Sequence, residues 1–439
     1  MTPRPASLPA GIDVVSEGLA ELHRLCLPLD DGEVADYIPQ LALADRDGFG
    51  LALVSMDGHR YQAGDSDLRF TLQSVTKPFV LALALAELGP AEVGRRVGCE
   101  PSGEAFNAIS LDHATGRPAN PMINAGAIAV TALVPAAGPD ERFARILDGL
   151  GRFAGRPLDV DEDVYRSESE TGDRNRALAY LMRGTGALSG DPVEAAETYF
   201  RQCSVRADVN DLAVMAATLA NGGVNPVTGE AVVPEPVAVQ VLAVMATCGM
   251  YDGAGEWMVR VGLPAKSGVS GGLVAVSPDR FGVAAHSPPL DPVGNSVRGV
   301  AAVRELSERF GLHLMHNAAP GAATVTLATT HHDGRIALVA ARGALDFTAA
   351  ERVLFALAER TPDRPGWVVL DLERATAADE TARAMLHRAL TLLADDGHRV
   401  VVVGNAPAGG LPSGDPWELA ATREQALARA EAEAAQPAQ

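Results

Sequence analysis

The stretch Gln73-Ser74-Val75-Thr76-Lys77-Pro78 opens a long apolar segment and guides the interpretation of the fold. The pattern predicts a helix over Leu72–Leu88 that ends at Gly89-Pro90, because glycine and proline disfavour continued helix. Ser74 and Lys77 are three residues apart, so a helix places them on one face, one turn apart. Ser74 then lies near the helix N-terminus, where free backbone N–H groups favour developing negative charge.

Lysine is rare in this chain, and its two positions are therefore informative. Of the 36 Lys and Arg residues, only Lys77 and Lys266 are lysine, and the other 34 are arginine. A lysine amine can lose its proton inside a protein, whereas a guanidinium group stays charged. A partly buried lysine of lowered pKa can accept the proton of a serine, which is otherwise a poor nucleophile at neutral pH. The plainer interpretation is an N-cap Ser74 beside a solvated Lys77.

The second lysine lies in Lys266-Ser267-Gly268-Val269-Ser270-Gly271-Gly272, which reads as a strand that leads into a glycine-rich turn. The pair of motifs S-x-x-K and K-S/T-G resembles the serine-hydrolase site of penicillin-binding proteins and class A β-lactamases. There the second lysine supplies positive charge, and a backbone N–H of its strand helps to hold the oxyanion. The alternative is an edge-strand lysine before an ordinary turn. Because both lysines occur in the two motifs in the right order, we expect a catalytic site.

Residues 13–316 predict one α+β domain. Residues 13–45 read as helical, with a break at Pro28–Gly32. Phe49–Met56 and His59–Gly64 predict a hairpin across Asp57-Gly58, a dipeptide that favours tight hairpin turns. We expect their sheet to be antiparallel, to pack on a mainly helical half and to place the serine between the two. The other expected strands are Leu273–Ser277 and Arg280–Ala285, and the expected helices are Asn124–Leu133, Asp140–Phe153, Arg174–Arg183, Pro192–Arg201, Val209–Leu219, Pro236–Cys248 and Ser296–Phe310.

A change in composition to Asn, Pro, Gly and Ala at Asn317–Ala323 predicts a linker. Strands and helices alternate after it, which indicates a small separate α/β domain over residues 322–430. The expected strands are Thr324–Thr330, Arg335–Ala341, Trp367–Leu372 and Arg399–Val403, and the expected helices are Phe347–Arg360, Asp379–Ala394 and Trp417–Glu433.

Composition excludes several classes of function. The net charge of -20 argues against nucleic-acid binding. The four cysteines form no CxxC pair, so neither a zinc site nor a disulfide framework is expected. No secretory signal precedes the first domain, and no apolar stretch is long enough for a membrane span. We therefore expect a cytoplasmic protein without a metal or a membrane partner.

Further segments make the first domain similar to the serine-dependent glutaminases of bacteria and mitochondria. The resemblance implies a β-lactamase-like fold and hydrolysis of L-glutamine to L-glutamate and ammonia, without a metal or organic cofactor. It also implies a homodimer or homotetramer. The segments run in order through residues 30–310 and are Val34–Ala42, Gln73–Pro78, Asn120–Ile128, Glu168 with Arg174-Asn175, Met250–Gly255 and Pro264–Gly272.

The resemblance implies a role for each matching residue. Ser74 attacks the side-chain amide to form a γ-glutamyl ester, and Lys77 accepts the serine proton. Tyr251 helps to move protons to the leaving ammonia, and whether it or Lys77 is the main base stays open. Backbone N–H groups of Ser74 and Val269 hold the oxyanion, and Tyr37 covers the site. The positions that grip the α-amino and α-carboxylate groups of glutamine are Asn124, Glu168, Asn175 and Tyr199, with Glu168 as a natural ammonium partner.

Each binding position also has a plainer explanation. Asn124 and Asn175 are residue types that cap helices. Glu168 lies in an acidic segment with Glu162, Asp163 and Glu170, which could be a solvated loop. Tyr199 could belong to the hydrophobic core.

The second domain resembles the STAS fold of anti-anti-sigma factors and sulfate-transporter tails. Leu345-Asp346-Phe347-Thr348 and Val368–Leu372 carry the likeness. Where anti-anti-sigma proteins have a phosphorylated serine, this chain has Asp379-Glu380-Thr381-Ala382. A phosphate on Thr381 would suit a helix N-terminus. The altered motif favours a simple helix cap on a regulatory or assembly domain, whose protein partner is unknown.

Two other functions remain open from the sequence. Another serine hydrolase of the same architecture, such as a β-lactamase or peptidase, would cleave a chromogenic β-lactam and release no ammonia from glutamine. A ligand sensor would bind glutamine without turnover. Against a sensor, the chain retains nucleophile, base and oxyanion elements together.

Overall fold

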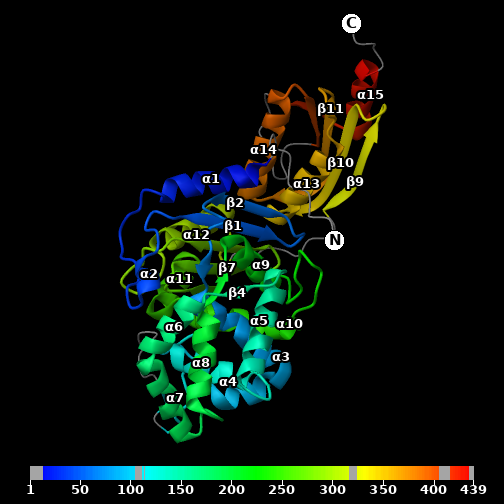
Figure 1. Cartoon of the computed structure of the whole chain (residues 1–439). Coiled ribbons are helices and arrows are strands. Elements are labelled where there is room, and N and C mark those ends of the chain that lie inside the picture. Colours follow the sequence, from blue (N-terminus) through cyan, green and yellow to red (C-terminus); the bar gives the residue numbers. More distant parts are fainter. Residues whose placement is uncertain (1–12, 104–110, 113, 316–323, 405–415, 435–439) are drawn as a thin grey trace. The chain divides into compact units, whose positions relative to one another are not determined.

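The computed structural model describes residues 13–103, 111–112, 114–315, 324–404 and 416–434 (Figure 1). Backbone contacts divide these residues into two units. The first comprises residues 19–308 and 312–315, and the second comprises residues 13–18, 309–311 and the described residues from 324 onward. The expected linker Asn317–Ala323 lies outside the described residues.

A five-stranded antiparallel sheet forms one half of the first unit. Its spatial order is β2 (Arg60–Gly64), β1 (Gly50–Ser55), β8 (Phe281–His286), β7 (Gly272–Ser277) and β6 (Ala265–Ser267). The expected turn at Asp57-Gly58 joins β1 to β2, and Gly58 has a φ of 81°, which glycine adopts without steric cost. Every residue of β1, β7 and β8 is buried, so these strands lack the alternation of a half-exposed sheet.

The second half of the first unit is mainly helical. Helix α9 (Val209–Ala220) packs against β1, β7 and β8, and almost all of its side chains are buried. A capping box between Asp208 and Asp211 fixes its first turn. The helices between β1 and β6 include α3 (Lys77–Arg96), α4 (Asn124–Leu133), α5 (Pro139–Ala154), α6 (Glu162–Thr171), α7 (Asp173–Thr185), α8 (Pro192–Cys203), α10 (Glu235–Cys248) and α11 (Ala254–Arg260).

The remaining elements of this part of the chain are short or flank the sheet in sequence. A small sheet has the order β3 (Phe70–Thr71), β5 (Val205–Ala207), β4 (Asp159–Val160). The helices outside the central block are α1 (Val14–Cys26), α2 (Pro39–Ala42) and α12 (Val297–Phe310).

Two sequence expectations for this region and one of the plainer alternatives are wrong. Ser74 lies in a 3₁₀ turn, η2 (Gln73–Thr76), and the α-helix begins only at Lys77. Residues 27–38 contain no helix, because Pro28 and Gly32 interrupt the pattern over a longer stretch than expected. The acidic segment around Glu168 is helix α6, whose N-cap Asp161 accepts hydrogen bonds from the backbone of residues 163 and 164.

The second unit contains a five-stranded sheet of order β13-β12-β11-β10-β9. Only the β9–β10 pair is antiparallel, and the other neighbours are parallel. The strands are β9 (Val325–His331), β10 (Ile336–Leu345), β11 (Trp367–Ala378), β12 (Arg399–Val403) and β13 (Glu418–Ala420), and the helices are α13 (Phe347–Arg360), α14 (Glu380–Asp395) and α15 (Arg423–Ala434).

Two elements of this unit differ from the sequence expectation. Strand β11 continues to Ala378, six residues beyond the predicted end, because it keeps pairing with β10 through two register shifts. The predicted helix Trp417–Glu433 begins instead as the edge strand β13, because Glu418–Ala420 pairs with β12. Asp346 and Asp379 cap α13 and α14 with side-chain hydrogen bonds to the backbone of Ala349 and Ala382.

Candidate active site

The proposed nucleophile Ser74 lies in a tightly constrained turn. The turn η2 contacts β6 and β7 of the sheet and α3 and α8 of the helical half. Ser74 is 6% exposed, and Gln73 before it has a φ of 49°, a sparsely populated region for a residue with a side chain. Backbone outliers of this kind cluster at functional sites, where the surrounding structure holds them. Ser74 thus lies between the sheet and the helices, immediately before the first turn of α3.

Lys77 is a buried amine that donates hydrogen bonds to two neutral groups. Its side chain donates to the carbonyl oxygen of Met122 at 3.0 Å and to Oδ1 of Asn124 at 2.8 Å. Burial disfavours the charged form and lowers the pKa of Lys77 to about 7. A substantial fraction of the amine is therefore neutral near pH 7 and can accept a proton.

Tyr251 connects Ser74 to the strand that carries Lys266. Its hydroxyl donates to the carbonyl oxygen of Ser267 at 2.9 Å, and it shares a hydrogen bond with Ser74. Burial raises the pKa of Tyr251 well above its ordinary value, and the bond to Ser74 opposes this shift. Because the phenol already donates to Ser267, Ser74 is the donor in the bond between them.

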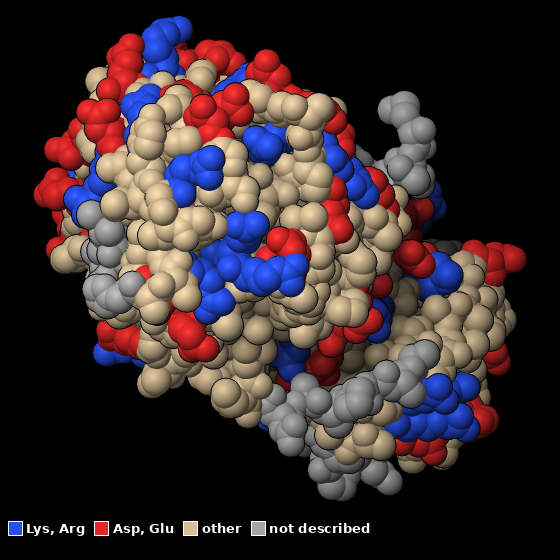
Figure 2. Space-filling view, turned by 90° about the horizontal axis from the view of Figure 1, so that it is seen from below, with Lys and Arg blue, Asp and Glu red and all other residues tan. Residues whose placement is uncertain are grey.

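Lys266 lies under the ring of Tyr251. Its Nζ is 3.9 Å from the ring centroid and donates to the carbonyl of Ser267 at 2.5 Å. Burial, together with the charge of nearby Lys77, lowers the pKa of Lys266 well below its ordinary value. Both lysines are buried, so the basic side chains on the surface in Figure 2 are arginines, interspersed there with acidic residues.

The glycine-rich loop after β6 approaches the serine turn closely. A Cβ added to Gly268 would lie 2.9 Å from Cγ2 of Val75 and 3.0 Å from the carbonyl oxygen of Leu72. A side chain at this position would therefore force the loop away from Ser74. Val269, next in the loop, packs against a small buried cluster of Ile38, Leu41 and Val164.

The four residues expected to grip the substrate, together with Tyr37, form two hydrogen-bonded groups. Asn124 accepts from Tyr199 at 3.3 Å and donates through Nδ2 to Oδ1 of Asn175 at 3.1 Å. Tyr37 donates to Oε1 of Glu168 at 2.7 Å. Glu168 is buried, and this burial raises its pKa. The solvated-loop interpretation of Glu168 is therefore wrong, and its carboxylate lies where a buried cation would be stabilised.

Two further residues, Gln73 and Cys203, lie among these side chains, although they are not among the site residues predicted from the sequence. Gln73 accepts from Tyr37 at 3.4 Å and has a side chain only 3% exposed. Cys203 is buried close to Lys77, Glu168 and Tyr199, and burial raises its pKa to about 12. The position of Gln73 beside Ser74 was a usable signal, whereas nothing in the sequence around Cys203 indicates its surroundings.

Thr381 belongs to the second unit. It lies in the first turn of α14, and its hydroxyl donates to the carbonyl oxygen of Arg309 at 3.0 Å. Asp379, two residues before Thr381, occupies the cap position. The helix-cap interpretation therefore accounts for the local motif without a phosphate.

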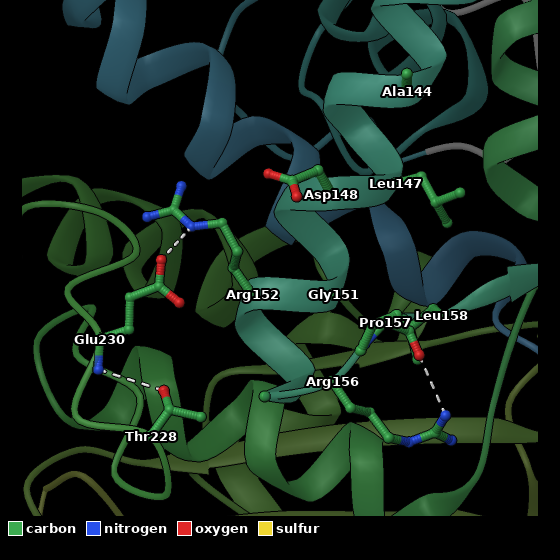
Figure 3. A pocket seen from close by; sticks show the side chains of 11 residues that line it. Ala144, Leu147, Asp148, Gly151, Arg152, Arg156, Pro157, Leu158, Thr228 and Glu230 are labelled. Atoms are coloured by element: carbon green, nitrogen blue, oxygen red, sulfur yellow. Dashed lines mark hydrogen bonds and ion pairs between the residues drawn. The ribbon is translucent and has the colours of Figure 1, made fainter. Parts of the chain in front are cut away.

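A hollow of about 480 Å³ lies beside α5, and Figure 3 shows its lining. Arg152 pairs there with Glu230, with 2.6 Å between Nε and Oε1. Arg156, which also lines the hollow, pairs with Asp211. None of the predicted site residues lines this hollow, so it is distinct from the group around Ser74.

Among the described residues, no single helix is long and apolar enough to cross a membrane. The helices Glu235–Cys248 and Tyr251–Arg260 reach the required length and composition only as a pair, which is bent by 94°.

Comparison with known proteins identifies the family. The family model described as glutaminase matches residues 32–315. The glutaminase of Corynebacterium efficiens is 43% identical over 412 residues, which are 92% of this chain and 94% of that protein. The glutaminase of Clavibacter michiganensis subsp. michiganensis is 54% identical over 296 residues, which are 67% of this chain and 91% of that protein.

A solved structure supports the same assignment. The crystal structure of Mglu in its glutamate form has a TM-score of 0.68 and 40% sequence identity, and the match covers 88% of this chain and 98% of that one. The fold is a mixed α+β fold that fits the β-lactamase-like class. The chain belongs to the glutaminase family and is an enzyme that hydrolyses glutamine to glutamate.

Proposed function

We propose that hydrolysis proceeds through a γ-glutamyl ester of Ser74. The neutral amine of Lys77 removes the hydroxyl proton while the serine oxygen attacks the side-chain amide carbon of glutamine. The C–N bond of the tetrahedral intermediate then breaks, and the amide nitrogen takes up a proton and leaves as ammonia. Water attacks the ester, its proton passes to the base, and cleavage of the ester C–O bond releases glutamate and restores the serine.

The observation that carries this proposal is the burial of the Lys77 amine, three residues after Ser74. Burial lowers the pKa of Lys77 to about 7, the range in which a general base is most effective near neutral pH. Tyr251, hydrogen-bonded to Ser74, is the second candidate for proton transfer. Its pKa is raised, so its role is to relay a proton to the leaving nitrogen while Lys77 serves as the base.

The surrounding groups suit the charges that develop. The backbone N–H groups of Ser74 and Val269 hold the oxyanion. The buried amine of Lys266 donates to the carbonyl of Ser267 and contacts the Tyr251 ring, so it supports the position of Tyr251 beside the serine. Glu168 binds the α-ammonium group of glutamine, and Tyr37, which donates to Glu168, covers the site. The amide and hydroxyl groups of Asn124, Asn175 and Tyr199 bind the polar end of the substrate and orient its side chain.

The family assignment favours glutamine hydrolysis over the function of a β-lactamase, a peptidase or a non-catalytic sensor.

We further propose a catalytic domain over residues 13–316 and a regulatory or assembly domain of STAS type over residues 322–430. The parallel strands and intervening helices of the second unit support that comparison. We also propose a cytoplasmic homodimer or homotetramer, and Thr381 remains a candidate phosphorylation site.

The experiment is to trap the ester. Enzyme mixed with glutamine and quenched in acid within one turnover should carry a glutamyl group on the peptide that contains Ser74, detected by mass spectrometry. Ser74→Ala should lose both the adduct and ammonia release. Ser277→Ala, at a buried serine of β7, is the control and should keep both. Full turnover by Ser74→Ala would exclude this mechanism.

A further inference from the structure

A chain of three buried side-chain hydrogen bonds ends on the backbone of the serine turn. Thr131 donates through Oγ1 to Oε1 of Gln202 at 2.8 Å. Gln202 donates through Nε2 to Oγ1 of Thr76 at 3.0 Å, and Thr76 donates to the carbonyl oxygen of Gln73 at 2.8 Å. All three side chains are 0% exposed, so water cannot replace a lost partner without opening the core.

This series of hydrogen bonds involves two of the helices that carry other site residues, α4 and α8. Thr131 lies on α4, two turns after Asn124, and Gln202 lies on α8, one turn after Tyr199. Thr76 is the last residue of η2 and the N-cap of α3. The three bonds therefore tie α4, which carries Asn124, and α8, which carries Tyr199, to the turn that presents Ser74.

The acceptor at the end of the chain is the carbonyl of Gln73, the residue with the positive φ. A backbone conformation of this kind persists only where surrounding contacts hold it. The hydrogen bond from Thr76 to the carbonyl of Gln73 links the first and last residues of the turn, and Ser74 lies between them in sequence. Loss of this bond would let the turn relax toward a more populated conformation and would move the serine oxygen.

We propose that Thr76, Gln202 and Thr131 are positioning residues that hold the turn of the nucleophile in its reactive conformation. None of the three needs to touch the substrate. The direction of the bonds is uniform, since each hydroxyl or amide donates toward the turn, and a uniform chain strengthens each bond in it. This inference rests on the proposed role of Ser74.

The first test compares two substitutions at one position. Thr76→Ser keeps the hydroxyl and should retain kcat within about threefold, whereas the isosteric Thr76→Val should lower kcat about tenfold or more, because small misplacements of a reacting group are costly. KM for glutamine should change less than kcat. The control is Thr218→Val, which removes a hydroxyl that is also 0% exposed and bonded to the carbonyls of Phe153 and Val214.

The comparison with the control separates positioning from general stability. If Thr218→Val lowers the melting temperature as much as Thr76→Val but leaves kcat intact, the loss at Thr76 is specific to the turn. Equal kcat in Thr76→Val and Thr76→Ser would overturn the inference.

The second test uses two residues outside the turn: Gln202, which donates to Thr76, and Thr131, which is linked to the turn through Gln202. Thr131→Val should lower kcat by about threefold, and Gln202→Leu by more. Because Thr131 acts through Gln202, adding Thr131→Val to the Gln202→Leu variant should cost no further kcat. Additive losses of kcat would contradict the proposed positioning role of these hydrogen bonds. Native kcat in both Thr131→Val and Gln202→Leu would also contradict it, even if Thr76→Val failed to fold.

Ser74→Ala separates this inference from the proposed function. Loss of turnover in Ser74→Ala together with native kcat in Thr76→Val and Gln202→Leu would leave the nucleophile in place and remove only the positioning chain. Native turnover in Ser74→Ala would remove both.

Discussion

The amine of Lys77 donates a 2.8 Å hydrogen bond to Oδ1 of Asn124, the first residue of α4. The same oxygen accepts from the hydroxyl of Tyr199 at 3.3 Å, so the base and the substrate-side groups share one amide. The Nδ2 atom of that amide donates to Asn175. The position of the lysine is therefore coupled to the residues proposed to hold the substrate.

Lys77→Arg should abolish useful turnover. Arginine keeps the positive charge but cannot lose its proton, so the serine has no base. Removal of a general base costs about 10²–10⁴-fold, which should appear in kcat when ammonia release is measured. Arg304→Lys, on the exposed side of α12, is the control and should behave like the native enzyme. Near-native turnover in Lys77→Arg would remove Lys77 from the mechanism.

The pH dependence of catalysis should follow the same amine. Burial lowers the pKa of Lys77 to about 7, so the base is protonated and inactive below that pH and neutral above it. We expect kcat to rise with pH through about 7 and then to level off. Melting temperatures over the same pH range serve as the control for unfolding. A flat profile from pH 5 to 9 in a folded enzyme would argue against a titrating lysine.

Glu168→Gln should weaken substrate binding more than it weakens chemistry. The buried carboxylate, which accepts from Tyr37 at 2.7 Å, is the proposed partner of the α-ammonium group. Loss of a charged hydrogen bond of about 1.5–3 kcal/mol should raise KM for glutamine by about tenfold or more. Glu170→Gln, an exposed position on the same helix, should leave KM unchanged. A kcat defect at native KM would place Glu168 in the chemical step.

Gly126→Ala should destabilise the fold. A Cβ at Gly126, in the first turn of α4, would collide with the carbonyl of Asn120. The backbone of α4 would have to shift, and such overpacking costs about 1–3 kcal/mol of the free energy of unfolding. Gly94→Ala in α3 is the matched control, because its Cβ would meet nothing within 4 Å and alanine favours helix. Thermal melting should fall for the first variant and hold or rise for the second.

A chain that ends at Met315 should keep glutaminase activity. Every proposed catalytic and binding residue of the site belongs to the first unit, and the Clavibacter relative is matched over 91% of its length by 296 residues of this chain. A unit with its own core should retain kcat within about threefold. Loss of activity in a folded protein of this length would give the second unit a part in catalysis. A change in oligomeric state alone would support an assembly role.

Much of the fold was predictable because its signals are local. The Asp57-Gly58 turn, the helix over Asn124–Leu133 and the strand around Lys266 follow from turn residues and apolar periodicity in neighbouring positions. The errors occur where distant contacts override local preference. The sequence predicts that a helix begins at Trp417, whereas the residues after it, Glu418–Ala420, pair with β12, a partner that no local pattern specifies.

The site divides in the same way. The sequence by itself determined which residue types are available, namely a serine three residues before one of only two lysines and a second lysine before a glycine-rich loop. Only the tertiary structure decided that the Lys77 amine is buried and that Gln73 takes a positive φ. It also decided that Thr131, Gln202 and Thr76 bond in series. The reason is that residue identity is a property of one position, whereas burial and hydrogen-bond partners arise when segments distant in sequence pack together.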